Sequence, residues 1–184
     1  MPVEKLSSED QFDRYAKFVA QVYESDPNFR PDDHLALMIS NRSPFASHSL
    51  AQPFWFRDAD RITAAATALV DERFNRHWNQ RAGHVLHFEA LPEADEDARL
   101  VLTGACDWLR EKGCTFARAG FLYGWQIGFT VDSYDVPPTT FHTYSKPYYH
   151  RYLKNAGFAT ERGLVELGWA PGLRQVVKTL FAVR

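Results

Sequence analysis

The sequence lacks the features that mark several large classes of protein. Its 21 Lys and Arg residues stand against 23 Asp and Glu residues, for a net charge of −2. It therefore has no basic excess for nucleic acid and no polybasic patch for a membrane surface. No run of about 18 apolar residues predicts a membrane-spanning helix. The start, MPVEKLSSED, is not laid out as a secretion signal. We expect a cytoplasmic protein with no nucleic-acid or membrane partner.

Cysteine and the common catalytic motifs are also scarce. Cys106 and Cys114 are the two cysteines and form no C-x-x-C pair, which favours free thiols in a reducing compartment. Neither a G-x-S-x-G nucleophile motif nor a phosphate loop is present. His84 and His87 are three residues apart, so on a strand they fall on opposite faces. The sequence therefore predicts no metal site.

What is present is enough apolar sequence for one packed domain. Of 184 residues, 45% are hydrophobic and 15% are aromatic. Helical spacing predicts a helix from about residue 9 to Tyr23, with Ser8 and Gln11 as a capping box. The first half then predicts a short helix at 32–40, a loop, strands at 53–57 and 61–72, and an irregular connection at 73–83.

The second half predicts a strand, a helix and a strand at 83–91, 95–113 and 114–123. Such a unit favours parallel pairing of its two strands. Next come a long irregular stretch at 124–146, a helix at 147–157, a strand at 159–169 and an amphipathic helix at 171–184. That last helix is expected to pack on its own domain or to pair with another copy in a homodimer.

The order of three segments resembles the GNAT acyltransferase superfamily. They are HVLHFEAL leading into DEDARLVLTGACDWLREKGC, the strand FARAGFLY, and the aromatic helix YYHRYLKNAGF with its Gly-Phe ending. The resemblance implies an α/β fold with a central mixed sheet: antiparallel N-terminal strands, a parallel strand-helix-strand unit, and helices on both faces. It implies one GNAT-like domain over 1–170. Residues 171–184 would belong to the same domain or form an oligomer contact.

Four residues are the candidates for chemistry. The resemblance implies acetyl transfer from acetyl-CoA to a small-molecule amine, with Glu89 as base and Tyr152 or Tyr149 as acid. Burial would raise the pKa of Glu89 toward neutrality, which suits a base. His87 and Glu89 are two apart on a strand, so regular alternation points them the same way, roughly 7 Å apart. The alternatives are that the carboxylate and imidazole are solvated or paired, and that the tyrosines are core residues.

Two further positions complete the predicted site. Leu91 opens the stretch LPEADEDARLV, where the resemblance implies cofactor binding. Trp125 follows Gly124 in a bend and is a candidate lining residue of the acceptor pocket, with core packing as the alternative.

The same stretch has no glycine and is acidic. Glu93, Asp95, Glu96 and Asp97 stand where the resemblance puts a pyrophosphate on helix N–H groups. Carboxylates stabilise a first helical turn, but they repel a second anion at that distance. Two hypotheses follow. The chain is an N-acetyltransferase, or it is a GNAT-fold module that has lost coenzyme A binding and binds a ligand or partner.

Overall fold

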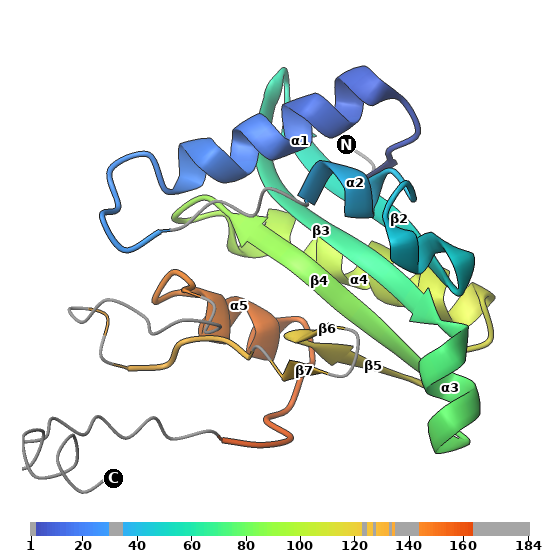
Figure 1. The fold of residues 1–184 in the computed structure, drawn as a ribbon. Coiled ribbons are helices and arrows are strands. Elements are labelled where there is room, and N and C mark those ends of the chain that lie inside the picture. Colours follow the sequence, from blue (N-terminus) through green and yellow to red (C-terminus); the bar gives the residue numbers. More distant parts are fainter. Residues whose placement is uncertain are drawn as a thin grey trace, which may run out of the picture.

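A five-stranded mixed sheet organises the chain (Figure 1). The computed structural model describes residues 3–29, 35–122, 125–126, 128–132, 134 and 144–163. The strands follow the order β1-β2-β3-β4-β5, antiparallel except for the parallel pair β4-β5. Their bounds are Glu4–Lys5, Ser49–Asp58, Arg61–Asp71, Ala82–Ala90 and Phe116–Ala119. A small antiparallel pair, β6 (Phe121–Leu122) and β7 (Trp125–Gln126), follows.

Helices cover both faces of the sheet, as predicted (Figure 1). The helices are α1 (Glu9–Val22), α2 (Leu35–Ile39), α3 (Glu72–Trp78), α4 (Asp95–Glu111) and α5 (Tyr149–Asn155), with a 3₁₀ turn η1 at Pro44–Ser47. One face of β2–β4 packs in a core with α4 and α5, and the other face packs against α1 and α2. Within the described residues, no helix is long and apolar enough to cross a membrane. The predicted α/β class with a parallel strand-helix-strand unit is therefore confirmed.

The alanine-rich segment is a strand because it is buried on both faces. Ala64, Ala65, Ala66 and Ala68 of β3 are fully buried. Even-numbered alanines pack toward α4, and Ala65 packs toward α1. Small side chains let both helix layers approach the sheet, and this packing outweighs the helix propensity of alanine. The predicted capping box on α1 is also confirmed, with Ser8 and Gln11 bonding each other's backbone N–H.

Three sequence-based boundaries were wrong. The segment 73–83 contains helix α3, whose first turn is capped by the Asp71 side chain accepting from the Phe74 N–H at 2.9 Å. Strand β2 begins at Ser49 because Ala51 and its neighbours pair with β3 ahead of Pro53. Residues 159–163 carry no strand. The predicted strand's remainder, the helix at 171–184 and the domain boundary near 170 lie outside the described residues.

Gly83 allows β4 to pack closely on α4. A Cβ atom at Gly83 would lie 2.6 Å from the Cδ2 atom of Leu109, which is itself buried. We therefore expect Gly83→Ala to lower the unfolding free energy by about 1–3 kcal/mol, measured by urea unfolding. Gly104→Ala is the control, because its Cβ would meet only the Val3 side chain, at 3.2 Å. That helical substitution should be neutral or stabilising. Equal losses at both sites would contradict this account of Gly83.

Candidate functional site

A β-bulge in β4 decides which way Glu89 points. The register between β3 and β4 shifts between Ala65 and Thr67, and His87 has a left-handed backbone with φ of 48°. Its carbonyl accepts a 2.8 Å hydrogen bond from the Tyr15 hydroxyl. A bulge adds one residue to a strand and so reverses the side-chain alternation beyond it. The regular alternation expected for His87 and Glu89 is therefore wrong.

The packing on either side of the bulge shows the reversal. Val85 packs in the α4 core, and Leu86 packs on the opposite face with Met38. After the bulge, Phe88 and Ala90 lie in the α4 core. Without the extra residue those two positions would face α1. The bulge thus places Glu89 on the side of the sheet that carries α1.

The same region is where β4 and β5 part. Their parallel pairing runs from Ala82↔Phe116 to Val85↔Ala119. One more backbone contact follows, from the Gly120 N–H to the Val85 carbonyl at 3.3 Å. Beyond it, the end of β4 faces helix α5 in place of a strand. The backbone groups on that edge need other partners, because buried unpaired polar groups are costly.

Tyr149 satisfies part of this edge and also holds Glu89. Its hydroxyl accepts a 3.0 Å hydrogen bond from the Ala90 N–H and donates at 2.6 Å to Glu89 Oε2. The side chain is 1% exposed. Burial, followed by the neighbouring Glu89 charge, raises the pKa of Tyr149 well above its ordinary value. The phenol therefore stays protonated and acts as a fixed hydrogen-bond donor to the carboxylate.

Two more tyrosine hydroxyls, one from the N-cap of α5 and one from α5 itself, bond to the backbone at this edge. Tyr148 donates to the Ala90 carbonyl at 3.1 Å, and Tyr152 donates to the Leu91 carbonyl at 3.2 Å. Tyr152 is fully buried. Its hydroxyl is bonded to backbone, whereas that of Tyr149 is bonded to Glu89. Of the two predicted acids, the structure brings Tyr149 into contact with the predicted base.

Glu89 has a strongly perturbed carboxyl group. Burial raises its pKa to about 8, against the opposing effects of the Tyr149 and Tyr23 hydroxyls and the Lys146 charge. A carboxylate with a pKa near the working pH can both take and release a proton. A buried carboxyl group with a raised pKa is typical of a general base. A carboxylate with a purely structural role would be unfavourable at the same position.

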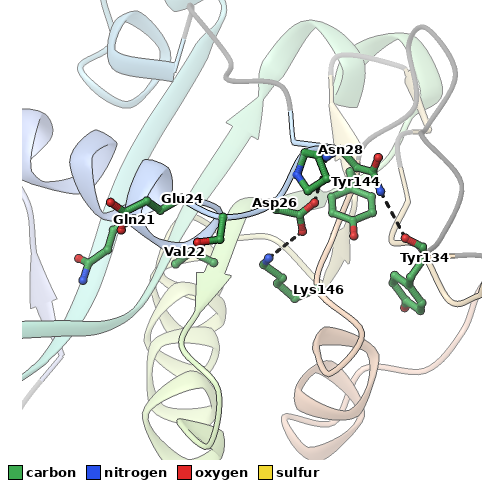
Figure 2. Close-up of a pocket in the computed structure, with 10 residues that line it drawn as sticks. Gln21, Val22, Glu24, Asp26, Asn28, Tyr134, Tyr144 and Lys146 are labelled. Carbon is green, nitrogen blue, oxygen red and sulfur yellow. Dashed lines mark hydrogen bonds and ion pairs between the residues drawn. The ribbon is translucent and has the colours of Figure 1, made fainter.

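An open pocket lies at the end of α1 (Figure 2). It has a volume of about 450 Å³. Its lining comes from the end of α1, the loop after it and the segment before α5: Gln21, Val22, Glu24, Ser25, Asp26, Pro27, Asn28, Tyr134, Tyr144 and Lys146. Most of these side chains are polar, and Glu24 and Asp26 offer negative charge to a cationic amine.

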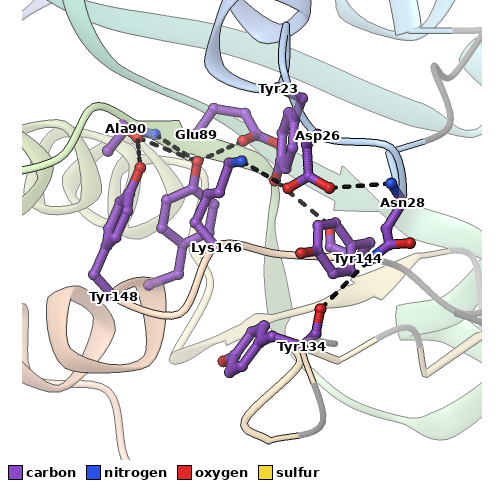
Figure 3. A network of polar contacts seen from close by, with 10 residues as sticks. Tyr23, Asp26, Asn28, Glu89, Ala90, Tyr134, Tyr144, Lys146 and Tyr148 are labelled. Carbon is purple, nitrogen blue, oxygen red and sulfur yellow. Dashed lines mark hydrogen bonds and ion pairs between the residues drawn. The ribbon is translucent and has the colours of Figure 1, made fainter. Parts of the chain in front are cut away.

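A partly buried ion pair lines the pocket, and the charge of its lysine acts on Glu89 (Figure 3). Lys146 Nζ lies 2.8 Å from Asp26 Oδ2, with the two side chains 17% and 12% exposed. Burial acts to raise the pKa of Asp26, but hydrogen bonds from Lys146 and the Asn28 N–H outweigh it and hold the pKa low. Sequence reasoning missed both residues. The sequence marks them only by their segments: Asp26 lies in the turn-forming SDPNFRP, and Lys146 lies in SKPYY.

The start of α4 does not fit the pyrophosphate of coenzyme A. Its first turn carries Asp95, Glu96 and Asp97. Asp95 is paired with Arg151 at 3.1 Å and Glu96 with Arg99 at 2.6 Å, so both nearby guanidinium groups are already used. An added diphosphate would meet the remaining negative charge directly.

Leu91, the predicted cofactor-binding residue, also has its backbone committed. Its N–H donates to the Thr63 carbonyl at 2.9 Å, and its carbonyl accepts from Tyr152 and from the Ala94 N–H. Neither group is presented to a ligand. Trp125 lies in β7, and its side chain is outside what the structure describes. Among the described residues, no three His, Cys, Asp or Glu side chains are grouped as metal ligands.

The fold resembles those of several solved acetyltransferases. An aminoglycoside acetyltransferase from an uncultured soil metagenomic sample, in complex with trehalose, shares 13% identity, with 92% of this chain and 95% of that chain covered and a TM-score of 0.56. AAC(6')-Iy, in complex with a bisubstrate analogue of CoA and acetylneamine, shares 10% identity, covering 92% and 97% at a TM-score of 0.53.

A third match carries the superfamily's name. A tandem GNAT protein from the clavulanic acid biosynthesis pathway shares 14% identity, covering 84% of this chain and 43% of that one at a TM-score of 0.57. No family model matches the sequence. No curated protein matches it at a significant level. The likeness lies in the arrangement of the sheet and its helices, and the chain has a GNAT-like fold.

Proposed function

We propose that the protein is an N-acyltransferase that transfers an acetyl group to a small, polar amine, with Glu89 as the general base. The observation that supports this is the Glu89 carboxyl, its pKa raised to about 8, which the bulge turns to the face of the sheet that carries α1, the helix whose end lines an open polar pocket. The fold is that of acetyltransferases, and two of the similar structures are named for aminoglycoside acetylation or contain an acetylneamine analogue. Fold alone does not establish activity.

The chain's own residues would act on the amine in the following way. The amine arrives as an ammonium ion and is held by the acidic groups of the pocket. One of them is Asp26, whose partner Lys146 also acts through its charge on Glu89. Glu89 accepts a proton from the ammonium, leaving the nitrogen lone pair free to attack. Tyr149 fixes the orientation of Glu89 Oε2 through its 2.6 Å hydrogen bond. Of the two candidate acids, Tyr149 is favoured because its hydroxyl is at this site. His87 contributes the bulge that directs Glu89.

The identity of the acyl donor needs a direct experiment. Acetyl-CoA is the donor that the fold implies, but the acidic start of α4 disfavours its pyrophosphate. The same observation favours a second function, a GNAT-fold module that binds a ligand or partner without coenzyme A. The two functions make opposite predictions for the purified protein.

We expect acetyl transfer to an amine panel that includes polyamines and amino sugars, read by release of free thiol. Acetyl-CoA and S-acetyl-N-acetylcysteamine, a thioester without the nucleotide, should be compared as donors. At about 100 times its Kd, a donor should add about 2.7 kcal/mol of stability and raise the melting temperature by about 5–10 °C. Transfer from the short thioester alone would show a working site that does not use the nucleotide. No transfer and no shift with either donor would overturn the enzyme and leave the binding module.

A further inference from the structure

Lys146 occupies a site built for an ammonium ion. Its Nζ atom lies 2.8 Å from Asp26 Oδ2 and 4.6 Å from the centre of the Tyr23 ring. Its positive charge also acts on the carboxyl of Glu89. A cation that lies over an aromatic face and is paired with a carboxylate is stabilised by both kinds of contact. Figure 3 shows the Lys146 side chain running toward both acidic groups.

The walls of this site are held in place independently of Lys146. Tyr23 stacks on Phe29 with ring centroids 4.0 Å apart, and its hydroxyl donates to the Tyr144 carbonyl at 3.4 Å. Asp26 accepts from the Asn28 backbone N–H at 3.1 Å. Glu89 is held by Tyr149. Removing the lysine amine would therefore leave its binding groups in position.

The site also has a route to solvent. Asp26 and Lys146 both line the open pocket, whereas Glu89 does not line it (Figure 2). A ligand that enters the pocket therefore meets the Lys146–Asp26 pair. An ordinary buried ion pair of this kind contributes little net stability, because desolvation offsets the attraction. Replacing the Lys146 ammonium with the ammonium of a ligand costs less than breaking the ion pair, since the second cation restores the same contacts.

We propose that Lys146 is an internal stand-in for the acceptor, and that the amine places a primary ammonium against Asp26 and over the Tyr23 ring by displacing the Lys146 side chain. The inference rests on the proposed function and names its substrate class: an amine on an unbranched methylene chain, like that of lysine. Such an ammonium supplies three N–H donors. Quaternary ammonium ions have no N–H donor for the Asp26 carboxylate.

The test uses Lys146→Ala, which empties the space, without any acyl donor. We expect n-butylammonium to raise its melting temperature by about 5–10 °C at roughly 100 times its Kd. Tetramethylammonium at equal ionic strength should give no such shift. Lys146→Met, which fills the space with an uncharged chain, and the double variant Asp26→Asn/Lys146→Ala should lose the response. Equal shifts with both cations, or an equal shift in Lys146→Met, would overturn the proposal.

A second measurement uses the wild-type protein and does not depend on the folding of a variant. The ¹³Cε resonance of Lys146, assigned with Lys146→Arg, should move on addition of n-butylammonium and stay in place with tetramethylammonium. A resonance that ignores both ions contradicts the displacement. Because both readouts omit the donor, ammonium binding without any acetyl transfer would count against the proposed function alone. Transfer without ammonium binding here would count against this site alone.

Discussion

Replacing Glu89 by glutamine is expected to stabilise the protein at alkaline pH while removing its activity. Glutamine has nearly the same shape and cannot ionise. Its amide oxygen can still accept the Tyr149 hydrogen bond that Glu89 Oε2 accepts at 2.6 Å. The wild-type carboxyl has its pKa raised to about 8 by burial, from about 4.3 in an unfolded chain. The folded protein therefore binds this proton more tightly than the unfolded chain does.

The sign of the pH dependence follows from that difference. Below about pH 4, Glu89 is protonated in both the folded and the unfolded state, so its ionisation does not lower the unfolding free energy. As the pH rises from there to about 8, the unfolded chain releases its proton while the folded protein keeps it, so wild-type stability falls. The loss levels off above about pH 8, at about 3–5 kcal/mol. Glu89→Gln avoids it, so the variant should match the wild type at about pH 4.5 and exceed it most at about pH 9.

Two measurements check this expectation. Urea unfolding at both pH values gives the stability difference, with Glu93→Gln, at an exposed position, expected to change it by less than about 0.5 kcal/mol. Loss of a general base should lower kcat/KM for the best amine by about 10²–10⁴. A stabilised variant with full activity would mean that Glu89 is an unfavourable buried carboxyl with no role in proton transfer. A variant with no alkaline gain would contradict the raised pKa.

The sequence predicted the elements of this site better than their geometry. Apolar periodicity and a glycine ending predicted the strand and the helix that carry Glu89 and Tyr149, and the resemblance to the GNAT superfamily made these two residues candidates. The bulge at His87 has no local signal, since histidine is not a residue that usually adopts positive φ, and its cause is tertiary: the Tyr15 hydroxyl holds the His87 carbonyl. One extra residue reversed the face of Glu89.

The ion pair could not be predicted for a related reason. Asp26 and Lys146 are 120 residues apart, and each stands in a turn-rich segment without periodicity. Their contact exists only because α1 and the segment before α5 end on the same side of the sheet. The helix α3 was missed because its residues are polar and mostly exposed, so no apolar stripe marks it.

Tyr149→Phe is expected to lower stability more than Tyr148→Phe does, and to make Glu89 harder to ionise. The variant removes the 2.6 Å donor to Glu89 and leaves the buried Ala90 N–H without its 3.0 Å acceptor. The Ala90 N–H is then buried without its acceptor and Glu89 loses the Tyr149 donor, for a loss of about 2–4 kcal/mol in urea unfolding. Because the Tyr149 hydroxyl lowers the pKa of Glu89, its removal should move the acidic limb of the pH–rate profile, which reports the ionisation of a general base, to higher pH.

Tyr148→Phe is the matched control for this last prediction. Tyr148 is partly exposed, and it donates to the Ala90 carbonyl at 3.1 Å. Only this one acceptor loses its donor in Tyr148→Phe, and Glu89 keeps Tyr149, so the cost should be about 0.5–1.5 kcal/mol with no shift in the pH profile. If both variants lose the same stability and leave the profile unchanged, the phenols only close the free edge of β4. If Tyr149→Phe alone moves the profile, the same hydroxyl both closes that edge and sets the proton affinity of Glu89.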